Sequence, residues 1–437
     1  DGQGSLTIDN NGTVTSKTTP LTGSLTFVAM SVKGGSSLTA DTLAIGSSLT
    51  IDTSSTMTLN TLTTSGGNHL TINSSSVLTA GAVTVGTLAL PGNLSITGGS
   101  TLTHAATTST TLNKLTVTVY GNTTIDATSL INLNGKGYPF TYTAGVAGAP
   151  TTSGGSTGRT GGSHGGTGGD HDGAGGTQGA VYDSFTAPLY PGAGGGEGAS
   201  CGCTVTPGSG YLKLTTAGFA MSGTISADSA GSNSASGAGG GIWIVTTGAV
   251  TGSGTISANG GGGAGVGGGG GGRVAFYYDS SVTGNGTITL GFQARGGLES
   301  GAVYNGGAGT VYVEKTDIYA AGQGDLTVDN NVDSSKLTPI FITGGVNSQI
   351  LNNLTSANFG RLHIGCTTSV GADTSCSPAR TFVRTGTATN GTYAITTGTN
   401  VTSSANLPPA VGYTADNVIP LAQISGNTTG GTVTVTF

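Results

Sequence analysis

The sequence predicts an all-β protein: a parallel β-solenoid, or β-helix, with glycine-rich layers resembling polyglycine II and no significant helix. A two-strand pattern recurs four times between residues 208 and 330, and a shorter rhythm of about 20 residues runs through residues 1–135. No sustained 3.6-residue apolar period occurs in the 437 residues. Glycine accounts for 84 residues and charged residues for only 7%, so the composition is far from that of an average globular chain. We therefore expect stacked coils that form a rod.

Residues 1–135 are expected to form solenoid coils of about 20 residues. An apolar–hydroxyl–apolar tripeptide recurs at offsets of 19, 24, 21, 24 and 21. Strand alternation places its outer two residues inside and its middle residue outside. The middle residues predict an external hydroxyl ladder of Thr7, Thr26, Thr50, Thr71, Ser95 and Thr116. This ladder is a soluble strand face, a surface for lateral packing or glycan attachment, or an ice-binding face, which would need a flat Thr-x-Thr lattice that one row does not supply.

Residues 136–207 form a glycine-rich segment. Taken alone, such a composition suggests a flexible linker. Within a repeat fold, glycine also lets extended chains pack closely as polyglycine or polyproline II rods, and we favour this ordered interpretation. The densest polar group in the chain lies here, and it can be a solvated turn, a set of side chains that bond the backbone between rods, or a metal or catalytic site. Its members are His164, Asp170, His171 and Asp172.

Residues 208–330 contain strand repeats of about 31–38 residues. The first strands of the four copies begin at Tyr211, Ile242, Val274 and Val311, and the second strands begin at Gly223, Gly254, Gly286 and Gly324. Three charged residues in or beside the repeat strands are expected to face outward or to pair with one another; they are Arg273, Glu299 and Glu314. Four aromatic residues on the repeat strands are expected to pack rather than to stack on sugars; they are Trp243, Phe276, Tyr277 and Tyr278. The single histidines His69, His104 and His363 are expected at surface or rung positions.

Residues 331–437 form a C-terminal β region with a cysteine loop and a bare alternating strand at 431–437. We expect the cysteines to form disulfides, with metal binding or free thiols as the alternatives, because the second Cys-x-x-Cys or histidine pair of a zinc site is missing. Disulfides imply an oxidising, extracellular setting. The candidates are Cys201, Cys203, Cys366 and Cys376.

Charge and hydropathy exclude several classes of function. The net charge is −6 with only 13 basic residues and no basic cluster, so we expect no nucleic-acid partner. No stretch of about 18 apolar residues is present, so we expect no membrane span. The chain opens at Asp1 without a signal-like region, which fits a mature, processed chain. The glycine runs lack the Lys-Ser/Thr of a phosphate loop, and we expect no cofactor, no metal and no catalytic residues.

A resemblance adds to this interpretation. The motifs Gly135-Lys-Gly-Tyr138, Gly161-Gly-Ser-His-Gly-Gly and Gly270-Gly-Gly-Arg-Val-Ala-Phe-Tyr-Tyr278, with Gly306-Gly-Ala-Gly-Thr-Val-Tyr312, resemble a glycine-rich repeat of very large bacterial and archaeal cell-surface and adhesin-like proteins. The similarity covers residues 135–335. It implies an exported, β-helical, non-catalytic surface role, although this chain is much smaller than those proteins.

One internal match bears on assembly. Residues 2–11 recur at 322–331, where the copy directly follows the strand that begins at Val311. The chain thus starts midway through a repeat, and neither terminus has an evident cap. We expect another subunit's strand, such as its C-terminal one, to complete the first coil head-to-tail; a frayed end or a processing cut at Asp1 is the alternative. The assembly candidates are Gly2, Gln3, Gly4, Leu6, Ile8, Val433, Val435 and Phe437.

Together these observations predict a structural subunit of an extracellular filament, sheath or cell-surface layer that pairs with itself. The alternative is an adhesin or fibre tip that binds surface glycans. A carbohydrate-active β-helix enzyme is a third and weaker possibility, since many polysaccharide-degrading enzymes share this fold but place clustered carboxylates on it.

Overall fold

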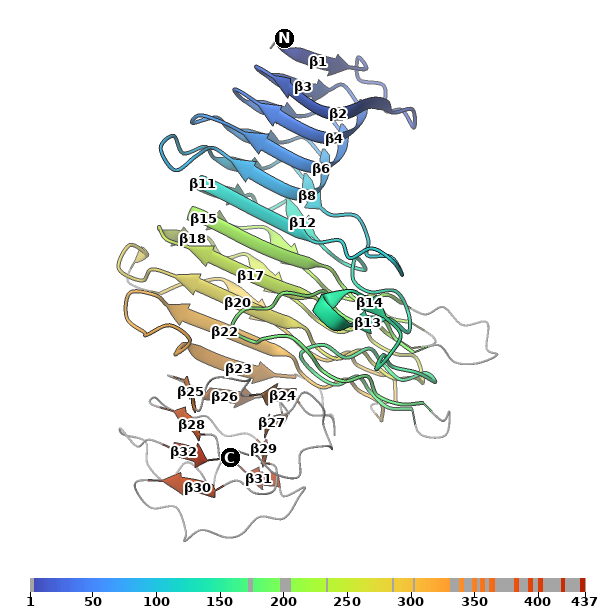
Figure 1. The fold of residues 1–437 in the computed structure, drawn as a ribbon, viewed down its shortest axis with the longest axis vertical. Helices are drawn as coiled ribbons and strands as arrows, with labels where there is room; N and C mark the ends of the chain where they lie inside the picture. The colour runs from blue at the N-terminus through green and yellow to red at the C-terminus, as the bar shows by residue number, and fades with distance from the viewer. Residues whose placement is uncertain are drawn as a thin grey trace.

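The computed structural model describes residues 4–171, 176–196, 206–232, 235–284, 287–301 and 303–330, and beyond them Thr338 and the backbone of strands between 338 and 436. The fold is all-β, as predicted: the described strands stack into a column with the N-terminus at one end and the C-terminal strands at the other (Figure 1). The helical element among the described residues is one 3₁₀ turn, η1 (Val146–Gly148).

The N-terminal coils combine short and long strands. Leu6 of the first strand pairs with Met30, and the ladder continues through Leu49, Leu70 and Leu94, all in parallel. The short strands are β1 (Leu6–Asp9), β3 (Met30–Lys33), β5 (Leu49–Ile51), β7 (Leu70–Ile72), β9 (Leu94–Ile96), β10 (Thr101–Thr103) and β12 (Leu130–Asn132). The long strands are β2 (Thr19–Phe27), β4 (Ser37–Ile45), β6 (Thr56–Thr64), β8 (Val77–Val85) and β11 (Leu115–Ile125). Leucine and isoleucine alternate with Thr and Ser along them, so the apolar side chains fill the interior.

The glycine-rich repeats continue the same column. Leu115 of β11 pairs with Leu212, which pairs with Ile242, and the ladder runs on through Val274 to Val311. These residues belong to β15 (Tyr211–Met221), β17 (Gly241–Thr246), β20 (Arg273–Tyr278) and β22 (Thr310–Lys315). A second ladder links β12 to β16 (Thr224–Ser226), β19 (Thr255–Ser257) and β21 (Gly291–Gln293), and β18 (Val250–Thr251) pairs with β15. The strands before and after the glycine-rich segment at 136–207 thus share one core.

Two second strands differ from the sequence pattern. In the third copy the strand is Gly291–Gln293 instead of the run from Gly286, because Phe292 takes the inward position opposite Ile256 and packs 5.4 Å from the Phe276 ring. In the fourth copy β23 (Asp325–Asp329) does not stack on β21. It turns back and pairs antiparallel with β22, with Val311 opposite Thr327.

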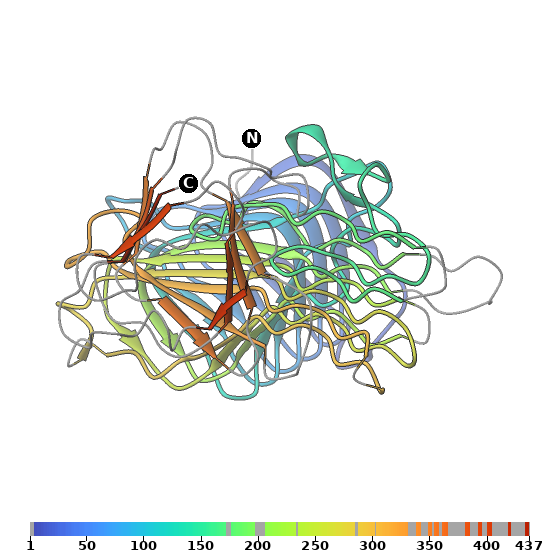
Figure 2. The ribbon, with the colours of Figure 1, turned by 90° about the horizontal axis from the view of Figure 1, so that it is seen from below.

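The glycine-rich segments lie beside the strands as a layer of extended rods (Figure 2). In the rod at 267–272, donors three residues apart reach the same neighbouring rod, which is the threefold period of a polyglycine II or polyproline II helix. The N–H groups of Gly267 and Gly270 bond the carbonyls of Arg159 and Gly162, those of Gly268 and Gly271 bond Tyr304 and Gly307, and those of Gly269 and Gly272 bond Gly261 and Ala258. The polyglycine II-like layer that the composition predicted is therefore present.

The remaining strands form small separate sheets. β13 (Thr143–Ala144) and β14 (Pro150–Thr151) make an antiparallel pair. One C-terminal sheet contains β24 (Thr338–Phe341), β27 (Arg361–Gly365), β29 (Thr392–Ile395) and β31 (Val418–Pro420), and another contains β25 (Ser348–Leu351), β28 (Thr381–Arg384), β32 (Val433–Thr436) and β30 (Asn400–Ser403). β26 (Leu354–Ala357) pairs in parallel with β23.

Candidate functional site

The predicted hydroxyl ladder is divided between different strands. Thr7, Thr50, Thr71 and Ser95 are in register in one row, which Ser31 joins. Thr26 instead pairs with Ala44 on the long strands, and Thr116 pairs with Ala82. The single ladder was therefore wrong, because the same tripeptide begins short strands at some positions and forms part of long strands at others. Met30-Ser-Val32 was missed because it replaces Leu and Ile while keeping the alternation.

Two further hydroxyl rows lie side by side on the long strands. Each contains Thr or Ser with one alanine, and none of the members is charged. One row is Ser24, Thr42, Thr61, Ala82 and Thr116, and the other is Thr26, Ala44, Thr63, Thr84 and Thr118. Thr61 and Thr63, like Thr116 and Thr118, project two hydroxyls from one strand. These two rows thus form a regular, uncharged array of hydroxyls and methyls, broader than the single row expected.

The polar group of the glycine-rich segment separates into the buried His164 and the half-buried Asp170 and His171. His164 is fully buried between rods, where its Nδ1 lies 2.9 Å from the carbonyl oxygen of Gly239 and its Nε2 lies 3.3 Å from Asp183 Oδ2. The same carboxylate accepts hydrogen bonds of 2.8 Å from the amides of Leu189 and Tyr190. His164 therefore holds the rods to the segment at 181–190. The sequence did not indicate Asp183, which lies 19 residues away in an unremarkable loop.

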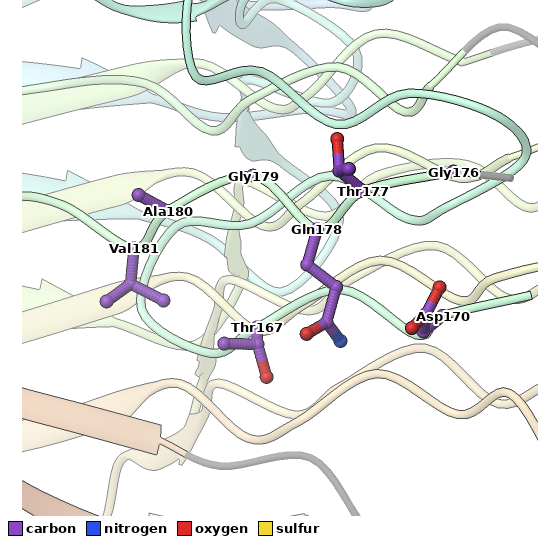
Figure 3. Close-up of a pocket in the computed structure, with 8 residues that line it drawn as sticks. All are labelled: Thr167, Asp170, Gly176, Thr177, Gln178, Gly179, Ala180 and Val181. Atoms are coloured by element: carbon purple, nitrogen blue, oxygen red, sulfur yellow. The ribbon is translucent and has the colours of Figure 1, made fainter. Parts of the chain in front are cut away.

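Asp170 lines a pocket at the edge of the rods, about 360 Å³ in volume (Figure 3). Its Oδ1 accepts a hydrogen bond of 3.4 Å from the Thr160 hydroxyl, and the side chains of Thr167 and Gln178 lie around the same opening. The rest of the lining is Gly176, Thr177, Gly179, Ala180 and Val181. His171 instead stacks on Tyr304, with ring centroids 4.7 Å apart. Asp172 lies outside the described residues.

Arg273, Glu299 and Glu314 are all buried, which corrects the expectation that they face outward or pair with one another. Arg273 donates from Nε to the carbonyl of Tyr182 at 3.0 Å and from Nη1 to the Thr310 hydroxyl at 3.2 Å. Glu314 accepts a hydrogen bond of 2.5 Å from the Tyr312 hydroxyl. Glu299 accepts from the amides of Gly301 at 2.8 Å and of nearby loop residues. Each charge is satisfied by backbone or hydroxyl groups, which is how an unpaired charge survives burial.

Two of these groups have altered acidity. Burial alone raises the pKa of the Glu299 carboxyl, but the hydrogen bonds from Gly301, Val303 and Ser300 together bring it below its usual value. Burial lowers the pKa of Arg273 to about 10, so the guanidinium still carries its charge at neutral pH. Both groups thus remain ionised, and their hydrogen bonds hold the neighbouring loops in place.

His104 is also buried, where a surface or rung position was expected. Its Nε2 accepts a hydrogen bond of 3.2 Å from the Tyr211 amide, and its Nδ1 lies 2.7 Å from the carbonyl of Ala105, so the ring is neutral with its proton on Nδ1. Burial lowers the pKa of His104 to about 4. His69 is exposed and accepts from the Asn93 amide at 3.1 Å. His363 is in β27, and its side chain lies outside the described residues.

The repeat aromatics pack as expected, in two different places. Phe276 and Tyr278 are in the core. Tyr277 and Trp243 are half-buried on the outer face; the Tyr277 hydroxyl donates to the carbonyl of Thr186 at 2.6 Å, and Lys213 Nζ lies 4.0 Å from the centre of the Trp243 ring.

The assembly candidates occupy both ends of the column. Leu6 and Ile8 are half-buried against the core and Gly4 is exposed. Within the described part of the chain, β1 pairs with β3 and β2 pairs with β4, and no strand pairs with their other edges. Val433 and Val435 belong to β32, which lies between β28 and β30 and so has partners on both edges. The C-terminal strand is thus not free to complete the first coil. Gly2, Gln3, Phe437 and the four cysteines, Cys201, Cys203, Cys366 and Cys376, lie outside the described residues.

Comparisons give no family assignment: no protein-family model, curated protein or solved structure matches this chain. In the described ranges, no helix is long and apolar enough to span a membrane, and no group of three or more His, Cys, Asp or Glu side chains is arranged to hold a metal ion. The structure places His164 beside Asp183, where the pair connects the glycine rods to the segment at 181–190. Asp170 lies apart from them and lines a pocket.

Proposed function

We propose that the chain is a structural subunit of an extracellular filament, sheath or cell-surface layer that assembles head-to-tail by pairing of β-edges. The observation that carries this proposal is the outer edge of β1 and β2, which has no partner strand in the described residues. The apolar side chains of these strands are also only partly buried; they are Leu6, Ile8, Leu21, Leu25 and Phe27. An unpaired parallel edge above a half-covered apolar layer is a template for another strand.

The interior supports a mechanical role. One column of strands runs unbroken from β2 to β22, and the rods beside it bond one another through backbone groups. The ionisable groups of the interior bond neighbouring loops and rods, as His164 and Glu299 do. Such a body transmits load through hydrogen-bonded backbone, and ladders that continue between subunits would resist heat and denaturant.

The resemblance to glycine-rich repeats of large cell-surface proteins supports an exported location. Disulfides among the four cysteines would fit that setting. The exported location and the disulfides are both part of the proposal. Self-association is its main interaction, and surface glycans are its additional partners.

An adhesin that binds surface glycans is the second candidate, and the pocket beside Asp170 favours it. A carboxylate, the Gln178 amide and the Thr167 hydroxyl surround an opening of sugar size at the edge of the rods. Binding of a purified glycan that is lost in Asp170→Ala, in a chain that stays monomeric, would favour this function.

Concentration-dependent assembly tests the primary proposal. The purified chain is incubated over a range of concentrations and analysed by sedimentation and negative-stain electron microscopy. We expect unbranched filaments above a critical concentration. A chain that remains a discrete particle at every concentration would contradict the proposal.

A further inference from the structure

The region after β22 repeats the start of the chain in order. Besides the match of residues 2–11 with 322–331, Ser16-Lys-Thr-Thr-Pro20 recurs as Ser335-Lys-Leu-Thr-Pro339, and Leu43-Ala-Ile-Gly46 recurs as Leu362-His-Ile-Gly365. All three matches have offsets of 319 or 320 residues. One short match could arise by chance in a chain of low complexity, but three in register indicate a second copy of the N-terminal coils.

Strand pairing supports this equivalence. β1 pairs in parallel with β3, with Leu6 opposite Met30, and β23 pairs in parallel with β26, with Leu326 opposite Leu354. β2 pairs in parallel with β4, and β24 likewise pairs in parallel with β27. The order of strands is shared but the register differs, since Thr19 lies opposite Leu38 and Thr338 lies opposite Leu362, the counterpart of Leu43. β1 and β23 thus start the same arrangement, at the two ends of the column (Figure 1).

β23 has a partner that β1 lacks among the described residues. Its other edge pairs antiparallel with β22, where Thr327 lies opposite Val311, Leu326 opposite Tyr312 and Asp325 opposite Val313. Three residues, Gly324, Asn330 and Thr338, fasten this joint with hydrogen bonds beyond the ladder. The Gly324 amide donates to the Tyr312 hydroxyl at 2.6 Å, Asn330 accepts from the Gly296 amide at 2.8 Å and donates to the Gly306 carbonyl at 3.1 Å, and the Thr338 hydroxyl donates to the Ala308 carbonyl at 2.6 Å.

Each fastening residue has a counterpart at the N-terminal end. Gly324 corresponds to Gly4, Asn330 to Asn10 and Thr338 to Thr19. Asn330 and Thr338 are buried in the joint, whereas Thr19 is exposed and Asn10 is half-buried. Among the described residues, the N-terminal coil thus has the chemical groups of the joint but not a strand like β22 beside them, and the Asn10 amide donates instead to the Thr13 carbonyl.

We propose that β1 of one copy docks on β22 of a second copy, in place of that copy's own β23. This inference rests on the proposed function and names its joint: Thr7 lies opposite Val311, Leu6 opposite Tyr312 and Ser5 opposite Val313. Thr19 donates to the Ala308 carbonyl of the second copy, and Asn10 bonds its Gly296 and Gly306. Exchange of a strand for a nearly identical one changes few contacts, which is why swapped elements give ready routes to assembly.

Crosslinking tests the register. Ser5→Cys with the half-buried Val313→Cys places two thiols opposite each other across the joint, and Thr7→Cys with Val313→Cys shifts the first thiol by two residues along the exposed side of β1. After treatment with a short thiol-reactive crosslinker, mass spectrometry of the linked peptides identifies which copies and positions are joined. We expect at least a fivefold excess of intermolecular linkage in the first variant.

A hydroxyl-specific variant tests the same joint without cysteine. Thr19→Val removes the predicted donor, and Thr22→Val, on the same exposed strand, is its matched control. We expect Thr19→Val alone to raise the critical concentration for assembly about fivefold, the effect of one lost hydrogen bond.

The outcomes separate the joint from the proposed function. One outcome would overturn the joint but keep the proposed function. In it, electron microscopy shows filaments, the two cysteine pairs give equal or no linkage, and the two valine variants have equal effects on assembly. The absence of both filaments and linkage would overturn both.

Discussion

At the scale of single residues, the fold depends on glycines that have no side chain. A Cβ on Gly269 would lie 1.9 Å from the carbonyl oxygen of Gly237, and one on Gly270 would lie 2.0 Å from that of Gly166. Atoms cannot approach so closely, so an alanine at either position must separate two rods. Hydrogen bonds between the rods require the short distance that only glycine allows.

Gly269→Ala should therefore lower the free energy of unfolding by about 3 kcal/mol, because overpacking adds to the loss of hydrogen bonds between rods. Gly284→Ala is the control, since a Cβ there meets nothing within 4 Å and its φ is not positive. Denaturant unfolding of both variants measures the difference. Equal stabilities would contradict a close-packed layer.

His104 gives a pH dependence whose sign follows from its burial. The ring has an ordinary pKa near 6.5 in the unfolded chain and a pKa of about 4 when folded, because burial, aided by the Lys136 charge, disfavours its protonated form. Between about pH 4 and pH 6.5 the unfolded chain therefore binds more protons at His104 than the folded chain does. The contribution of His104 should leave stability unchanged above about pH 6.5 and reduce it as the pH falls to about 4, by about 3 kcal/mol in total.

Unfolding measured between pH 7 and pH 4 checks this prediction. In His104→Gln this part of the pH dependence should disappear, whereas His69→Gln, at an exposed position, should keep it. An unchanged pH profile in His104→Gln would contradict the neutral, buried ring.

At the scale of elements, alternation and turn residues made strands predictable but not their register. The Leu-Thr-Ile pattern correctly located β1, β5 and β7, but it also matched the end of β2, because alternation is the same on every strand. Phe292 displaced the expected strand in the third repeat through a contact with Phe276, and Asp183 met His164 across a loop. Such partners depend on packing between distant segments, which spacing along the chain does not record.

The rods make a separate prediction at this scale. Each amide from 267 to 272 donates to a neighbouring rod, so all six should exchange with deuterium as slowly as the β-strand amides of β17 and β20. Hydrogen exchange with mass spectrometry measures this. Fast exchange of the run at 267–272 would show a mobile glycine linker, which is the alternative that composition alone left open.

At the scale of the whole molecule, the column of coils has an open edge at its N-terminal end, and the sequence of its first coils is repeated from residue 322 at the other end. The column from β2 to β22 ends in a joint with β23, and the sequence of β23 is repeated at the opposite end. The internal match at 322–331 was visible in the sequence. Its meaning required the antiparallel pairing of β22 with β23 and the placement of β32 between two other strands, which no sequence pattern indicates.

Helical reconstruction by electron cryomicroscopy of the assembled chain tests whether subunits join head-to-tail through the edge of β1. The account predicts a filament of this one protein with strands perpendicular to its axis, spaced about 4.8 Å apart along it, and with the first coil of each subunit covered by the next. Discrete rods or closed oligomers with the edge of β1 exposed to solvent would contradict it.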